Sequence, residues 1–159
     1  MASYVATVRW SRREGEKFTD NRYSRAHRWE FDGGAVVPAS ASPHVMRPPL
    51  SDPKGVDPEE ALVASLASCH MLFFLYFAAR QGFEIDSYID EAVGEMVKRA
   101  DGREWLAVAT LRPRIAFAGP KRPDAAAVDA LHHEAHEACY IANSVKTEVR
   151  IESRNEGLA

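Results

Sequence analysis

The segment from Asp57 to Gly82 constrains the fold of this chain more than any other part of its sequence. Asp57 suits the cap of a helix, Pro58 suits its first turn, and Glu60 completes a capping-box pattern. Apolar side chains then recur at helical spacing, and Gly82 favours a helix end. Alanines surround this stripe, so the sequence predicts a central helix of ~24 residues that is buried nearly all round. The stripe consists of Leu62, Leu66, Cys69, Phe73 and Phe77.

The residues before this helix alternate in a way that is typical of strands. Residues 4–10 and 27–31 each predict a strand, and an Asp-Gly-Gly turn leads from the second into residues 35–39 as a hairpin. Residues 40–55 contain four prolines, which exclude a helix or a central strand there. We expect an ordered loop in this segment, because a disordered linker would be richer in charged and flexible residues.

The residues after the central helix predict more strands and one further helix. Residues 85–99 and 104–118 are expected to form two long strands joined by an Asp-Gly turn, with Gly94 marking a bulge or bend. A second helix is expected from Pro123 to near Ser144, followed by a strand over residues 145–152. This order of elements predicts an α+β fold with antiparallel sheets.

Length and composition bound the class of protein. With 159 residues, 46% of them hydrophobic, the chain can form one core of ordinary size, so we predict a single domain over residues 1–159. No run approaches the ~20 apolar residues that cross a bilayer, and the N-terminus lacks a signal-peptide core, so no membrane partner is expected. A net charge of −3 gives no reason to expect nucleic acid either. Two cysteines cannot support a secreted disulfide scaffold, which indicates a reducing, cytoplasmic location.

The two cysteines, Cys69 and Cys139, allow two interpretations on the residues alone. Free cysteine is among the most buried residue types, so both can be small core hydrophobes. Each also falls on or next to the apolar stripe of its own predicted helix. If the two stripes pack together, the sulfurs come within bonding reach and form a candidate redox site. His70 follows Cys69 but points about 100° away from it on a helix, so we interpret it as structural.

Two segments around these cysteines resemble the OsmC/Ohr family. Residues 57–62 (Asp-Pro-Glu-Glu-Ala-Leu), continuing through residues 65–69, are similar to the central-helix signature of the family, in which a Cys follows a Glu by ten residues. Residues 135–139 are similar to its second Cys segment. The order of elements matches over residues 4–151, and residues 27–34 suggest a less characterised OsmC-like branch. The resemblance therefore covers essentially the whole chain.

The resemblance implies an OsmC-like fold, an intertwined homodimer, and active sites at the subunit interface. It implies a peroxidase that reduces organic hydroperoxides without a metal or other cofactor. Carried onto this sequence, Cys69 is the peroxidatic thiol, Cys139 the resolving thiol, and Glu59 the carboxylate of the site. The family also has an arginine that contacts the thiolate and the glutamate. Arg25 matches this arginine in one branch of the family and Arg47 in another, and we favour Arg25.

The chemistry explains why such residues belong together. A free thiol with a pKa of ~8.5 is only slightly ionised at neutral pH, and the thiolate is the nucleophile. Cys69 lies about three turns into the predicted helix, where the helix dipole has faded. A cation must therefore favour the thiolate, and an arginine held by Glu59 is suited to do so.

The spacing of Glu59 and Cys69 also predicts a dimer. Ten residues along one helix correspond to ~15 Å of rise and about 80° of rotation, so the two side chains of one helix cannot meet. If both belong to one site, the glutamate must come from a second copy of the helix, packed roughly antiparallel.

The expected reaction begins with attack of the Cys69 thiolate on the distal peroxide oxygen, which releases an alcohol and leaves a sulfenic acid. Cys139 then condenses with the sulfenic acid to form a disulfide. An external dithiol, either a lipoyl protein or a small thiol, reduces the enzyme again.

Two other interpretations compete with this one. His132, His136 and Cys139 fall on one helical face at a spacing that suits zinc. Zinc would hold Cys139 as a thiolate and prevent it from resolving a sulfenic acid. The other alternative is an OsmC-like small-molecule-binding protein in which the cysteines are inert.

Overall fold

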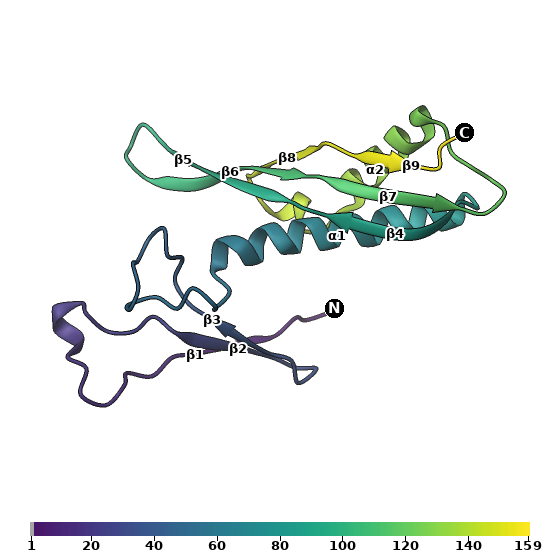
Figure 1. Ribbon diagram of the computed structural model, residues 1–159. Coiled ribbons are helices and arrows are strands. Elements are labelled where there is room, and N and C mark those ends of the chain that lie inside the picture. Colours follow the sequence, from purple (N-terminus) through teal and green to yellow (C-terminus); the bar gives the residue numbers. More distant parts are fainter. Residues whose placement is uncertain (1) are drawn as a thin grey trace. The chain divides into compact units, whose positions relative to one another are not determined.

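The computed structural model describes residues 2–159 and divides them into two compact units (Figure 1). The first unit ends at Ala61, and the second covers Leu62–Ala159. The single domain over residues 1–159 stays a prediction. The α+β fold class is confirmed, because two helices accompany three three-stranded sheets.

The first unit contains one antiparallel sheet in the order β1-β2-β3. Its strands are β1 (Ala6–Arg9), β2 (His27–Phe31) and β3 (Val36–Ala39), with a 3₁₀ turn at Phe18–Asp20. The predicted hairpin is confirmed, since the Phe31 amide donates to the Ala35 carbonyl at 3.0 Å and Gly34 takes a φ of 85°. The strand predicted over residues 27–31 has the bounds that the sequence indicated.

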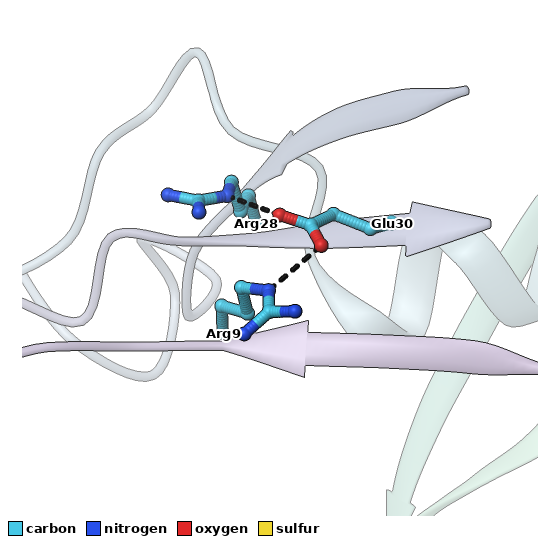
Figure 2. Close-up of polar contacts among 3 residues, drawn as sticks. All are labelled: Arg9, Arg28 and Glu30. Carbon is cyan, nitrogen blue, oxygen red and sulfur yellow. Dashed lines mark hydrogen bonds and ion pairs between the residues drawn. The ribbon is translucent and has the colours of Figure 1, made fainter. Parts of the chain in front are cut away.

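A charged triplet spans β1 and β2 on an exposed face (Figure 2). Arg9 and Arg28 are register partners, and like charges in this arrangement repel. Glu30 lies between them and accepts from the Nε atoms of both arginines at 2.7 Å. The hydrogen bond from Arg9, followed by that from Arg28, lowers the pKa of Glu30. The carboxylate thus offsets a repulsion that the strand pairing would otherwise create.

The proline-rich segment at residues 40–55 is irregular and well bonded, as predicted. The hydroxyl of the buried Ser40 accepts from the Asp52 amide at 2.9 Å. The Leu50 carbonyl accepts from the Arg25 amide at 2.8 Å, which ties this loop to the segment before β2. These contacts give the loop a defined path without a helix or a strand.

The long helix α1 (Pro58–Arg80) begins and ends as its sequence predicts. The Asp57 carboxylate accepts from the Glu60 amide at 2.8 Å, and the Glu60 carboxylate accepts from the Asp57 amide at 3.2 Å, which completes the capping box. At the other end Gly82 has a φ of 76°. The amides of Gly82 and Phe83 return to the carbonyls of Ala79 and Ala78, each at 3.0 Å, in a Schellman motif.

The structure buries one face of α1 rather than its whole circumference. The buried side chains follow a spacing of four residues, whereas Leu72 is 60% exposed and Tyr76 is 54% exposed. By length and composition alone α1 could cross a membrane, but the core helix of a globular protein meets the same test. All-round burial was predicted because apolar residues occupy every face, and hydropathy then cannot say which face meets the core. The buried stripe consists of Leu66, His70, Phe74 and Ala78.

The second unit holds two more sheets, in the orders β4-β7-β9 and β5-β6-β8. Both predicted long strands are interrupted near their middle, at residues 91–92 and at Arg112. The Asp-Gly turn is confirmed, with Gly102 at a φ of 84°. The outer pairings β6–β8 and β7–β9 are parallel, so these sheets are mixed rather than purely antiparallel. The strands are β4 (Glu84–Asp90), β5 (Val93–Lys98), β6 (Glu104–Leu111), β7 (Pro113–Ala118), β8 (Glu148–Ile151) and β9 (Arg154–Glu156).

The second helix, α2 (Ala125–Ala138), is shorter than predicted. Its start agrees with the sequence, since the Asp124 carboxylate accepts from the Ala127 amide at 2.8 Å. Its end comes earlier, because Cys139 adopts extended backbone with a φ of −66° and a ψ of 110°. A separate 3₁₀ turn follows at Ala142–Ser144. Cys139 therefore lies at the junction between a helix and a turn.

Candidate functional site

Packing of α1 against the end of α2 brings Cys69 and Cys139 together. Cys69 lies in the middle of α1 and is partly exposed, whereas Cys139 is only 1% exposed. Both are free thiols, and they lie close enough together for Cys69 to influence the pKa of Cys139. The two cysteines are therefore neighbours in the fold, as the sequence allowed. A thiol pair with one accessible and one buried member can be oxidised to a disulfide.

The surroundings of Cys139 favour its protonated form. Burial, followed by the hydrogen bond with the Cys69 thiol, raises the pKa of Cys139 to about 11. The Ala142 amide donates to its sulfur at 3.4 Å and opposes this effect only in part. At neutral pH Cys139 is thus a neutral thiol, and Cys69 is the more accessible sulfur of the two.

The turn after α2 is fixed by several hydrogen bonds. The Asn143 side-chain amide donates to the carbonyls of Glu137 and Cys139 at 2.9 and 3.0 Å. The Ser144 hydroxyl donates to the Tyr140 carbonyl at 2.7 Å. The Tyr140 ring also meets the Phe73 ring of α1 edge to face, with centroids 5.1 Å apart. The segment that carries Cys139 is therefore held both to itself and to α1.

A buried histidine pair joins α1 to α2. His70 Nε2 and His132 Nδ1 are 3.0 Å apart, and the two rings stack with centroids separated by 5.3 Å. Burial lowers the pKa of each to about 4, and His136 is a third, weaker influence on His70. Both imidazoles are therefore neutral at pH 7.

The sequence missed this pair, although one signal pointed to it. His70 lies four residues after Leu66 and four before Phe74, so it shares the phase of the buried stripe. The interpretation of His70 as structural agrees with its burial.

The structure does not assemble the proposed zinc ligands. His132 Nδ1 is engaged with His70 rather than directed to His136 and Cys139. Within residues 2–159 no group of three His, Cys, Asp or Glu side chains is arranged to hold a metal ion. Cys139 is a thiol in contact with Cys69, which suits disulfide chemistry instead.

Glu59, Arg25 and Arg47 lie in the first unit, and both cysteines lie in the second. One carboxylate oxygen of Glu59 is buried without a hydrogen-bond partner among the described residues. The Arg25 guanidinium donates to the Asn21 carbonyl at 3.0 Å and lies 4.0 Å from the Tyr23 ring centroid. The Arg47 side chain is exposed. The catalytic roles of all three residues stay predictions.

Comparison with known proteins shows the family of this chain. Residues 51–154 match the sequence model of the OsmC-like protein family, and this segment is more than half of the chain. The chain belongs to the OsmC family. An OsmC-like protein of unknown function from Vibrio cholerae is 51% identical to this OsmC-family protein, with a TM-score of 0.94 over 97% of this chain and 100% of that one.

More distant structures show the same fold. OhrB of Bacillus subtilis, an organic hydroperoxide resistance protein, is 19% identical, with a TM-score of 0.64 and 98% of each chain covered. An OsmC-like protein from Mycoplasma pneumoniae is 17% identical, with a TM-score of 0.72 over 98% of this chain and 99% of that one. At these identities the likeness concerns the fold alone. No curated protein matches the sequence.

Proposed function

We propose that this OsmC-family protein is a thiol peroxidase that reduces organic hydroperoxides to alcohols in a reducing cytoplasm. The observation that carries the proposal is the contact between the partly exposed Cys69 thiol and the buried Cys139 thiol. An accessible sulfur suits attack on a substrate, and a protonated, enclosed sulfur suits a second, resolving step. We propose that all 159 residues act as one domain in this role.

The first step oxidises Cys69 by two electrons. Its thiolate attacks the distal oxygen of the hydroperoxide, the O–O bond breaks, and the leaving alkoxide takes a proton to become the alcohol. Cys69 is left as a sulfenic acid. In this proposal an arginine, Arg25 or Arg47, stabilises the thiolate and the leaving oxygen, and Glu59 orients the guanidinium.

The second step forms the disulfide. The Cys139 sulfur attacks the sulfenic sulfur of Cys69, an S–S bond forms, and the hydroxyl leaves with the thiol proton as water. An external dithiol, a lipoyl protein or a small thiol, then reduces the disulfide and becomes a disulfide itself. No cofactor enters this cycle.

Three features of α1 support a homodimer as the working form. Its outer face exposes the apolar side chains of Leu72 and Tyr76, which would be covered by a second copy. Glu59 and Cys69 stand too far apart along α1 to meet, whereas an antiparallel second copy would bring one to the other. Among residues 2–159 one Glu59 oxygen is buried without a hydrogen-bond partner, which destabilises a fold, and a cation from a second copy would supply that partner.

Titration with cumene hydroperoxide tests the proposal. The reduced wild type should lose both thiols with one equivalent of peroxide, far faster than a free thiol does. Cys69→Ser should lose this reactivity, and Cys139→Ser should consume one equivalent and stop at the sulfenic acid. The peroxidase proposal would be contradicted if peroxide consumption survived Cys69→Ser, or if the wild-type thiols reacted with peroxide no faster than free cysteine. A binding protein of this fold would then be the remaining interpretation.

The choice of arginine is tested in the same assay. Arg25→Ala should slow thiol loss far more than Arg47→Ala does. The reverse order would assign the role to Arg47, and equal rates would remove both from the proposal.

A further inference from the structure

We propose that the His70–His132 hydrogen bond is a positioning pair that holds the Cys69 and Cys139 thiols within reach of disulfide formation. For its effect on turnover this inference rests on the proposed function. The geometric effect itself concerns only the two sulfurs and can be measured without a peroxide.

The pair is the buried polar link between α1 and α2. His70 is 1% exposed and His132 is 5% exposed, and one ring nitrogen of each meets the other at 3.0 Å. The Phe74 ring packs on His132 with centroids 4.4 Å apart, which encloses the pair further. A hydrogen bond is directional, so this contact limits both the rotation and the sliding of one helix against the other.

The two histidines belong to the same two segments of the chain as the two sulfurs. His70 directly follows Cys69 on α1, and His132 precedes Cys139 by seven residues, about two helical turns. Residues two turns apart lie on the same side of a helix. A disulfide needs the two Cβ atoms about 3.5–4.5 Å apart, so a small slip between the helices would separate the sulfurs.

The hydrogen-bond inventory argues against a purely stabilising role. In a neutral pair one imidazole donates and the other accepts, which leaves His70 Nδ1 and His132 Nε2. Both of these atoms are buried, and neither has a partner among the described residues. Buried polar atoms without partners destabilise a core, so two apolar side chains would pack there at lower cost. What the pair supplies instead is a fixed geometry.

Burial keeps both imidazoles neutral, and thereby keeps their hydrogen bond intact, at neutral pH. His136, one turn along α2, is the other titratable group that influences His70, and its Nδ1 is also buried without a partner. Burial is the main cause that lowers the pKa of His70 and His132. The bond therefore persists as a neutral one over the pH range in which thiols exchange.

The test measures the Cys69–Cys139 disulfide equilibrium in a glutathione redox buffer. Oxidised glutathione and the reduced protein give the protein disulfide and two molecules of reduced glutathione, so no other reactant is needed. The double variant His70→Leu/His132→Leu removes the bond and both unpartnered nitrogens, so it should remain folded. We expect its equilibrium constant to fall at least about tenfold below that of the wild type. A double variant that forms the disulfide as readily as the wild type would overturn the proposal.

A matched pair of single variants keeps the test decisive if the double variant does not fold. The amide of His132→Asn can replace Nδ1, whereas that of His132→Gln reaches the position of Nε2 instead. The Asn variant should stay near the wild-type equilibrium and the Gln variant should fall well below it. Equal values for the two would overturn the positioning role. A wild-type protein that forms the disulfide normally with glutathione but does not react with peroxide would count against the proposed function alone.

Discussion

The two faces of α1 have similar chemistry and different surroundings. One face carries Leu66, Phe74 and Ala78, all of which are buried, and the last two pack into the core of the second unit. The other face carries Leu72 and Tyr76, which are more than half exposed. Both faces are apolar, so the difference lies in what covers them.

This contrast teaches that one helix can serve two interfaces. The buried face joins α1 to the strands and to α2, and it includes the polar side chain of His70, which is hydrogen-bonded to His132. The outer face is the feature expected where a second copy docks, because exposed apolar patches mark association surfaces. Each face can be altered separately, which allows the two roles to be tested.

Truncation on the buried face should give the largest effect. Phe74→Ala removes a fully buried ring and should lower the free energy of unfolding by about 3–5 kcal/mol. Urea unfolding followed by tryptophan fluorescence measures this loss. Tyr76→Ala, two residues away on the exposed face, is the matched control and should cost less than about 1 kcal/mol at low protein concentration. Similar losses for both variants would contradict the assignment of the faces.

Acid should give the second-largest effect, by destabilising the buried face of α1. The pKa of His70 and of His132 is about 4 in the folded chain, against about 6.5 when unfolded. Between these values the unfolded chain binds more protons, so stability is complete above pH 6.5 and falls as the pH drops toward 4. One histidine accounts for a loss on the order of 3 kcal/mol.

Urea midpoints measured from pH 7.5 to 4 test this acid effect. Carboxylates contribute to acid unfolding in every variant, so the informative quantity is the difference between proteins. His70→Leu/His132→Leu should lose less stability across the window than the wild type. Parallel curves for the two proteins would show that the pair does not control the slope.

Charge on the outer face should act on association rather than folding. Leu72→Glu/Tyr76→Glu places two like charges on the proposed contact surface and should raise the dimer dissociation constant at least about tenfold. Sedimentation equilibrium measures this constant. Ala130→Glu adds a charge at an exposed position of α2 and should leave it unchanged. A double variant that stays as dimeric as the wild type would show that the interface lies elsewhere on the protein.

A change at the helix start should give the smallest effect and touch both faces alike. Asp57→Ala removes the acceptor of the Glu60 amide and should cost about 1 kcal/mol of unfolding free energy. Asp57→Asn keeps a capping oxygen and should cost a few tenths of that. Thermal unfolding of the two variants compares them, and an equal loss would mean that the cap contributes little.

Local signals predicted the local structure well. The strand at His27–Phe31, the cap at Asp57 and the end at Gly82 each depend on a few neighbouring residues, and all are confirmed. The closeness of Cys69 and Cys139 agrees with the expectation that their sulfurs meet if the two helices pack together. These features need only short-range geometry and one packing step.

Features set by distant contacts were not predictable in the same way. The face of α1 that meets the core is decided by the shape of the sheets, because its apolar residues carry no directional signal. The His70–His132 bond joins residues on different helices, and neither residue alone looks paired. The choice between Arg25 and Arg47 depends on irregular segments, where no periodic pattern places a side chain.

The parallel pairing of β8 with β6 and of β9 with β7 has a consequence for the synthesis of this chain. Register partners such as Val108 and Glu148 lie far apart in the sequence, because β8 and β9 follow α2 whereas β6 and β7 precede it. Until β8 and β9 leave the ribosome, β6 and β7 each present an open edge to which another nascent chain can add. Both sheets therefore close only after β8 and β9 have been synthesised, well after the strands with which they pair.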